Sequence, residues 1–407
     1  MKTLLSLILF LFIFESCQNS LQKKVIISSA KGGELLSKLD LNSIYKIVDN
    51  IDEDFKFEIE IYKLSYFTKD DNGNIVKASG VAVIPTSGNS RFEEINIQGY
   101  SVVVDCHSTI FINTKAPSLA INSVNSLYSA ILFSSKYGFI TLQPDYIGFG
   151  DSVTHYHPYL LQQSSANSVV DFYKEFLKFA EVKGLVLSNS GLYLTGYSQG
   201  AYIALASLPR FEKEGIKVKI TAPMDGIYIL APIIEMAFKY RYNPYPSYLT
   251  ALLYSYSKVY NLPLDNFIKE PYKSLISTLF NGAYSRKEID RYLTTKRDKI
   301  FLKSFIENFR ESKLYFHLLE NSVVDFLSYS KIDFVHCKGD NTIPIEFTKY
   351  TLKAFKGIGT KNVNLTQVED YFKLDKELNH KACAPFAYKI VAKKFDKIKN
   401  KNKVNIY

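Results

Sequence analysis

The clearest chemical signal in the sequence is a serine that lies between two glycines. Residues 196–200 read Gly-Tyr-Ser-Gln-Gly, with an apolar run before them (192–195) and an apolar segment at helical spacing after them (201–206). A sharp turn from a strand into a helix leaves no room for a side chain two positions either side of the serine. The helix N-terminus beside the serine also favours developing negative charge. The pattern predicts that Ser198 is a nucleophile.

A serine hydroxyl needs a base, and the base needs an orienting carboxylate. Three histidines follow Ser198 in the chain: His317, His336 and His380. We expect His317 and His336 to be packed residues, because one falls in a helical stretch and the other in an apolar strand. His380 falls in a polar segment, predicted as a loop between the last strand and the final helix. The sequence therefore predicts that His380 is the base.

The predicted acid is Asp340, which directly follows the apolar strand 332–337. Carboxylates at the C-terminal ends of parallel strands point toward the catalytic face of such a sheet. The rival carboxylates stand either at the wrong end of a strand or very near the imidazole in sequence: Asp333, Asp375 and Glu377.

An oxyanion formed by attack of the serine needs backbone N–H donors. We expect one from Gln199, directly after the nucleophile, and one from the loop that follows the first parallel strand, at Ser108 or Thr109. His107 lies in the same loop and precedes the nucleophile in the chain. We therefore expect it to shape the loop rather than act as a base.

The elements that must position these residues follow a strand–helix rhythm. Residues 55–61 alternate apolar and charged side chains, the turn signal 70–73 follows, and 76–85 return as a second strand. Apolar strands then alternate with helices, which predicts an α/β fold with a mostly parallel sheet covered on both faces. The strands are predicted at 100–105, 139–143, 191–195, 218–222, 332–337 and 362–368, and the helices at 119–136, 164–183, from 199, and at 344–355.

Between residues 236 and 330 the rhythm gives way to helical segments that hold twelve of the thirty tyrosines. This composition is typical of a helical subdomain with its own core, and also of a lid whose apolar face borders a substrate groove. The two interpretations are compatible.

The motifs together resemble those of the α/β-hydrolase superfamily, in particular its secreted lipase and esterase branch, over residues 55–398. Besides the Gly-Tyr-Ser-Gln-Gly segment, the resemblance is carried by the segments 144–152 with 157–160, 339–344, and 380 with 383–385. It implies that Ser198 is the nucleophile, Asp340 the acid and His380 the base. One departure is that residues 107–109 read His-Ser-Thr where relatives often have His-Gly-Thr. From this departure we expect the side chain of Ser108 to narrow the oxyanion loop or to add a hydroxyl donor.

Composition excludes several classes of protein. With 407 residues, 47% of them hydrophobic, the chain has enough apolar material for a large core, and four cysteines are too few for a disulfide scaffold. Half of the net charge of +10 comes from residues 393–403, which we interpret as a solvated tail and not a nucleic-acid arm. The sequence lacks a P-loop, an H-E-x-x-H motif and a C-x-x-C motif, so we expect no nucleotide cofactor and no metal.

The N-terminal residues predict export. Lys2 precedes an eleven-residue apolar stretch, 4–14, which is the length of a signal-peptide core and too short to span a bilayer. Cys17 follows, and a cysteine at the cleavage point resembles the lipobox of bacterial lipoproteins, in which the thiol is acylated. Gln18 points to the outer membrane in that family. The alternative is an ordinary secretory signal, which would give a secreted or periplasmic protein.

The resulting division of the chain has six parts. They are a signal peptide (1–16), a lipid-anchor tether (17–24), a first core part (25–235), a helical cap insertion (236–330), a second core part (331–398) and a basic tail (399–407). The pairing of Cys106, Cys337 and Cys383 stays open.

The function predicted from these features is that of an exported serine hydrolase cleaving small-molecule or lipid esters through an acyl-enzyme. The lipid anchor would attach it to the membrane. Two alternatives remain, a serine peptidase of the same fold and a surface-binding lipoprotein without catalysis.

Overall fold

The computed structural model describes residues 33–47, 53–88, 90–121 and 123–401. The predicted signal peptide, Cys17 and the tether lie outside the described residues, as does the end of the basic tail. Over the part of the chain that is described, no helix combines the length and the hydropathy needed to cross a bilayer.

The centre of the molecule is a nine-stranded sheet in the order β1-β2-β3-β5-β4-β6-β7-β8-β9. The first three strands and the β3–β5 pair are antiparallel, and all the other pairs are parallel. The predicted mostly parallel α/β sheet is confirmed. The strands are β1 (Glu34–Leu39), β2 (Phe57–Lys69), β3 (Ile75–Gly88), β4 (Val102–Cys106), β5 (Ile140–Pro144), β6 (Leu192–Tyr197), β7 (Val218–Met224), β8 (Lys331–His336) and β9 (Val363–Gln367).

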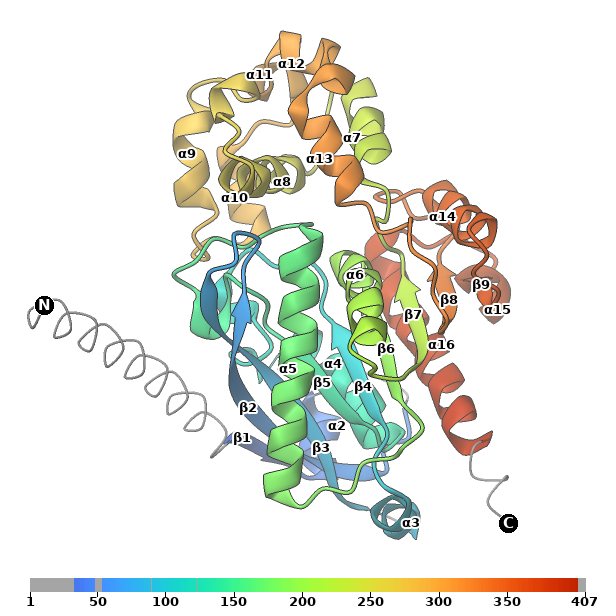
Figure 1. Cartoon of the computed structure of the whole chain (residues 1–407). Helices are drawn as coiled ribbons and strands as arrows, with labels where there is room; N and C mark the ends of the chain where they lie inside the picture. The colour runs from blue at the N-terminus through green and yellow to red at the C-terminus, as the bar shows by residue number, and fades with distance from the viewer. Residues whose placement is uncertain (1–32, 48–52, 89, 122, 402–407) are drawn as a thin grey trace, which may run out of the picture.

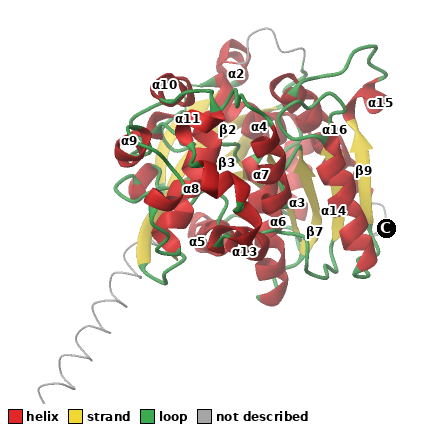
Figure 2. Ribbon diagram, turned by 90° about the horizontal axis from the view of Figure 1, so that it is seen from above, coloured by secondary structure: helices red, strands yellow, loops and turns green. Residues whose placement is uncertain are grey.

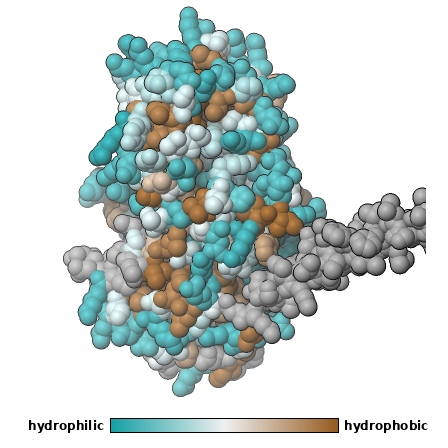
Figure 3. All heavy atoms as spheres, turned by 90° about the vertical axis from the view of Figure 1, so that its left-hand side faces the viewer, coloured by the Kyte–Doolittle hydropathy of each residue, from teal (hydrophilic) through white to brown (hydrophobic). Residues whose placement is uncertain are grey.

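The edge strand β1 is not among the strands that the sequence predicts. Its pairing with β2 shifts register between Leu35 and Ser37, which interrupts the alternation of apolar and polar side chains. On the face of the molecule to the left in Figure 1, apolar and polar side chains are interspersed (Figure 3). Leu35, Phe67 and Ile75 are among the exposed apolar residues, and scattered exposure of this kind is normal.

Helices cover both faces of the sheet, and β6 shows how the sequence achieves this. Leu192 and Leu194 pack into the cluster shared with α5 (Gln162–Lys183) and α6 (Gln199–Lys213). Tyr193, on the other face, packs into the cluster shared with α16 (His380–Lys401). The period of two places successive side chains on opposite faces. Figure 1 shows α5 and α6 in front of the strands.

Besides α5 and α6, further helices belong to the core, and one of them differs from its prediction. The helix predicted at 119–136 is shorter than expected: a regular helix of eight residues is followed by one π-helical turn, Leu132–Lys136. The core helices other than α5 and α6 are α2 (Leu41–Ile47), α3 (Ser90–Gln98), α4 (Val124–Ile131), α14 (Ile345–Gly357), α15 (Val368–Phe372) and α16 (His380–Lys401).

A group of helices lies in the chain between β7 and β8 and sits over one end of the sheet (Figures 1 and 2). Its interior includes an aromatic cluster, in which the Phe238 ring lies 5.8, 5.4 and 5.3 Å from the rings of Phe301, Phe305 and Phe309. We call this group the cap. Its helices are α7 (Leu230–Lys239), α8 (Pro246–Val259), α9 (Tyr272–Leu279), α10 (Arg286–Tyr292), α11 (Arg297–Ile300), α12 (Lys303–Glu307) and α13 (Lys313–Glu320).

The prediction that His380 lies in a loop is wrong, because α16 begins at that residue. Asn379 caps the helix: its side-chain oxygen accepts the N–H of Ala382 at 3.0 Å. This N-cap of α16 places the His380 imidazole in the first turn of the helix.

Candidate active site

The turn after β6 is held in a strained conformation. Ser198 has φ 58° and ψ −117°, outside the regions that residues with a side chain normally adopt. A Cβ on Gly200 would lie 1.8 Å from the carbonyl oxygen of Cys106, and one on Gly196 would lie 2.3 Å from that of Gly200. The close approach of the turn to the end of β4 therefore requires both glycines.

Three side chains that are far apart in the sequence meet at this turn. His380 Nε2 lies 3.0 Å from Ser198 Oγ, and His380 Nδ1 lies 2.6 Å from Asp340 Oδ2. Because a carboxylate only accepts, the Nδ1 contact assigns the ring proton to Nδ1 and leaves Nε2 free to accept from the serine hydroxyl. Ser198 and His380 are partly exposed, and Asp340 is buried.

The carboxylate is fixed from two sides. Asp340 Oδ1 accepts the backbone N–H groups of Thr342 and Ile343, each at 2.8 Å, while Oδ2 faces His380. Burial alone would raise the pKa of Asp340, but the hydrogen bond and charge of His380 and the N–H of Ile343 lower it below its usual value. The acid is therefore ionised near neutral pH, as an orienting carboxylate must be.

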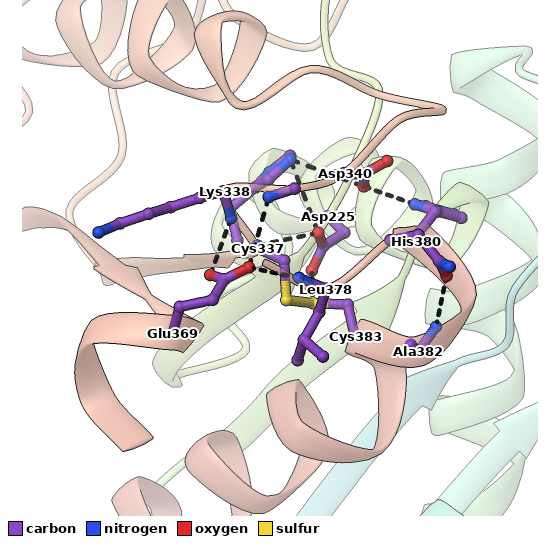
Figure 4. Close-up of a disulfide and its surroundings, with 12 residues drawn as sticks. Asp225, Cys337, Lys338, Asp340, Glu369, Leu378, His380, Ala382 and Cys383 are labelled. Carbon is purple, nitrogen blue, oxygen red and sulfur yellow. Dashed lines mark hydrogen bonds and ion pairs between the residues drawn. A yellow bond between two sulfur atoms is a disulfide. The ribbon is translucent and has the colours of Figure 1, made fainter. Parts of the chain in front are cut away.

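Two further contacts fix the position of His380. The hydroxyl of Tyr197, in the turn itself, donates to the backbone carbonyl of His380. A disulfide joins Cys337, at the end of β8, to Cys383 in the first turn of α16 (Figure 4). The pairing that the sequence left open is thus Cys337 with Cys383, and Cys106 is a buried free thiol.

The other two downstream histidines are engaged elsewhere. His336 is buried in β8, where its Nε2 lies 2.9 Å from the carbonyl oxygen of Ile343 and its Nδ1 2.8 Å from Thr348 Oγ1. His317 lies in the cap, with its ring stacked 3.7 Å from that of Tyr260. Both are packed residues, as their positions in the sequence indicate.

The loop after β4 packs against the turn that follows β5. His107 Nδ1 lies 2.8 Å from the carbonyl oxygen of Ser108, its ring stacks on Tyr146 at 4.0 Å, and the Tyr146 hydroxyl donates to the His107 carbonyl at 3.1 Å. Burial lowers the pKa of His107. Thr109 Oγ1 lies 3.1 Å from the Tyr159 hydroxyl. These contacts position the loop in which the second oxyanion donor is expected.

The side chain of Gln199 is fixed by a histidine that the sequence analysis did not assign to the site. His157 Nδ1 lies 2.8 Å from the carbonyl oxygen of Ile147, so Nδ1 carries the proton and Nε2 accepts from the Gln199 amide at 2.7 Å. Burial lowers the pKa of His157 to about 4, which keeps the ring neutral. In the sequence, His157 belongs to the segment 157–160, which contributes to the family resemblance but does not by itself indicate a role for this histidine.

Comparison with known proteins gives matches among solved structures. No family model and no curated protein matches the sequence. A Legionella pneumophila protein assigned as a hydrolase superposes with a TM-score of 0.80 at 22% identity, over 90% of this chain and 96% of that one.

Two further structures carry more specific descriptions. The rice cell wall degrading esterase LipA from Xanthomonas oryzae gives a TM-score of 0.77 at 18% identity, over 92% of this chain and 97% of that one. Candida antarctica lipase A, in its closed state, gives 0.59 at 12% identity, over 84% and 77%. The chain has the α/β-hydrolase fold.

In this α/β-hydrolase fold the cap borders a cavity of about 230 Å³ that reaches Ser198 and His380. Its wall is built mainly by apolar and aromatic residues of the cap, and none of the described residues that line it is an aspartate, glutamate, lysine or arginine. Thr109 and Gln199 line the cavity, whereas Ser108 is not among its described lining residues. The lining from the cap includes Ile233, Ile234, Met236, Tyr240, Tyr242, Tyr245, Tyr248, Leu249 and Leu252.

A second buried carboxyl group lies beside Asp340. Asp225 directly follows β7, and one oxygen of Asp225, one of Asp340 and a ring nitrogen of His380 lie within 4.8 Å of one another. Asp340 is predicted because it is a carboxylate directly after a parallel strand. The same criterion applies to Asp225 and would also predict it at this edge of the sheet. These atoms are spaced as metal ligands could be, but Asp340 and His380 are hydrogen-bonded to each other.

Proposed function

We propose that this protein is a serine hydrolase that cleaves carboxylic esters. The observation that carries the proposal is the chain of contacts from Ser198 Oγ to His380 Nε2 and from His380 Nδ1 to Asp340. Esterases and lipases are among the solved structures with the same fold, which supports the choice of an ester.

The mechanism follows from the geometry. Ser198 Oγ attacks the acyl carbonyl while His380 Nε2 takes the hydroxyl proton, and Asp340 stabilises the imidazolium. The imidazolium then protonates the leaving alcohol, and water activated at the same nitrogen hydrolyses the acyl-enzyme. The Gln199 N–H and a donor from the loop at Ser108 or Thr109 stabilise the oxyanion, each contributing on the order of 10² to 10³ in rate.

The cavity favours an apolar substrate group. Its described lining carries no full charge apart from what His380 acquires, so burial of an acyl chain or another apolar group costs no desolvation of charged protein groups. A peptidase with a preference for a charged side chain would need an opposite charge in this wall.

The test of reaction class is a panel of p-nitrophenyl esters set against aminoacyl p-nitroanilides. We expect turnover of the esters, and Ser198→Ala should lower kcat by a factor on the order of 10⁴ or more while the fold is kept. Turnover of the anilides alone would favour the peptidase. If a fluorophosphonate probe fails to label Ser198 in the native protein, the non-catalytic binding protein becomes the better hypothesis.

We also propose that the protein is exported and anchored to the outer membrane through Cys17, with secretion or a periplasmic location as the alternative. The disulfide between Cys337 and Cys383 supports an oxidising compartment, because such bonds are rare in the cytosol. Cys17→Ser in the full-length chain should move the protein from the membrane fraction to the soluble fraction. Unchanged fractionation would contradict the anchor.

A further inference from the structure

The inference concerns Asp225, which the mechanism above does not use. Asp225 directly follows β7, is fully buried and has φ 44°. Its N–H donates to the carbonyl oxygen of Val335 at 3.0 Å, and its Oδ1 accepts the N–H of Cys337 at 3.1 Å. The side chain is therefore attached to β8 just before the loop that carries Asp340.

The surroundings of this carboxyl group place it against the site. One oxygen of Asp225 lies within 4.8 Å of an oxygen of Asp340, and His336 Nε2 lies 3.6 Å from Asp225 Oδ1 and 3.7 Å from Asp340 Oδ2. The sulfur of Cys383 lies 3.1 Å from Asp225 Oδ2. The sulfur belongs to the disulfide and has no proton to donate. Figure 4 shows Asp225 between the disulfide and Asp340.

Two carboxyl groups this close in a buried place cannot both be ionised. The negative charge is better stabilised on Asp340, because this carboxylate accepts two backbone N–H groups and the His380 N–H. Asp225 accepts one backbone N–H, from Cys337. Burial, and then the charge of Asp340, raise the pKa of Asp225 well above its usual value.

We propose that Asp225 is a positioning residue: as a protonated carboxylic acid it donates a hydrogen bond to the Asp340 carboxylate and holds it toward His380. The proton stays on Asp225 throughout the reaction. The kinetic consequence rests on the proposed function, but the protonation state does not.

The other titratable groups facing Asp225 come from every element around it. His336 lies in β8 and is kept neutral, since burial lowers its pKa. Tyr197 at the end of β6 and Tyr228 after β7 are neutral as well, since burial raises their pKa values. Glu369 in α15 and His380 in α16 complete the set. Of these groups, His380 is the one whose charge changes during the proposed reaction.

The first experiment compares Asp225→Asn with Asp225→Ala. Asparagine keeps an N–H donor toward Asp340 and an oxygen for the Cys337 N–H, so kcat should stay within about threefold of the wild type. Alanine removes the donor, and kcat should fall by about 10- to 100-fold with little change in KM. Equal losses in both variants would overturn the proposal.

The pH profile separates a neutral Asp225 from an ionised one. If Asp225 were ionised, its charge would raise the pKa of the base, and Asp225→Asn would move the acid limb of kcat/KM down by about one unit. We expect the acid limb of Asp225→Asn to coincide with that of the wild type. A downward shift would overturn the proposal even if the alanine variant does not fold.

An infrared measurement tests the protonation state without any activity. The difference spectrum of wild type minus Asp225→Asn at pH 7 should contain the C=O band of a protonated carboxylic acid. The control for the pH profile is Asp105→Asn, because Asp105 is also fully buried but bonds to Ser129, Gln143 and Tyr388, away from Asp340. This variant should leave the acid limb of kcat/KM unchanged. If the band is present but the protein lacks esterase activity, the proposed function fails and the protonated Asp225 stands, whereas absence of the band overturns the inference.

Discussion

Cys337 and Cys383 form a disulfide that lies three residues from Asp340 on one side and three residues from His380 on the other. Both cysteines are fully buried. The bond therefore links the loop that carries Asp340 to the helix that carries His380, beside the 2.6 Å contact between His380 Nδ1 and Asp340 Oδ2.

The double variant Cys337→Ala/Cys383→Ala should lose stability and catalytic efficiency together. The closed loop spans 46 residues, and chain entropy alone gives a loss of about 4 kcal/mol in the free energy of unfolding. We also expect kcat to fall more than KM changes, because the loop and the helix lose their link. Chemical denaturation and ester kinetics measure the two effects. Cys106→Ala, at the buried free thiol, is the control; an equal loss of kcat there would show that the effect is not specific to the disulfide.

The turn at the nucleophile should not tolerate a methyl group. Gly200→Ala would place a carbon 1.8 Å from the carbonyl oxygen of Cys106, so the turn must move away from β4. We expect either failure to fold or a folded protein whose kcat is lowered by at least about 100-fold, since the oxyanion donors shift with the turn. Gly357→Ala at the end of α14 meets nothing within 4 Å and should keep full activity. Full activity in Gly200→Ala would contradict the described geometry.

The sequence is sufficient to predict β2 to β9, the turn and the three residues that meet there, because each depends on a local pattern, whereas β1 is not predicted. The alternation around β2, the apolar run before Ser198 and the position of Asp340 after a strand all belong to short segments. His380 was found by elimination among three histidines, although its helical start depends on the Asn379 cap and was missed.

What the sequence could not supply are contacts between segments far apart in the chain. The pairing of Cys337 with Cys383 and the approach of Asp225 to Asp340 depend on how β7, β8 and α16 are arranged in space. The contact of His157 with Gln199 depends on how the loop between β5 and α5 lies against the start of α6. Strand order is a global property of the sheet, so no local pattern specifies these neighbours.

The pH dependence of stability should report the charge on Asp340. Its pKa in the folded protein lies below the usual value, so the stabilisation is present above pH 3.8 and is lost as the pH falls through the folded pKa. The difference in unfolding free energy between wild type and Asp340→Asn should therefore be largest near neutral pH and shrink in acid. A difference that grows in acid would contradict the assignment.

Asp340→Asn should also lower kcat by a factor on the order of 10³ to 10⁴. A neutral amide does not stabilise the imidazolium, and its N–H can donate to Nδ1 and so favour the wrong tautomer of His380. Asp333→Asn is the matched control. Asp333 lies near the start of the same strand, β8, and pairs with Lys394 at 3.0 Å. Comparable losses of kcat in the two variants would show that substitution anywhere on this strand is damaging.

The cap cavity should select the acyl part of the ester by its size. Leu249 lies in α8, is 7% exposed and lines the cavity that reaches Ser198. Leu249→Trp fills part of the apolar space, so kcat/KM for p-nitrophenyl esters of long acyl chains should fall about tenfold or more, while the acetate ester changes by less than about twofold. Leu177→Trp on α5, where Leu177 is 36% exposed, controls for the bulk of the new side chain. A uniform loss over all chain lengths would mean that the substitution disturbs the site itself, and no loss at any length would place the acyl chain outside this cavity.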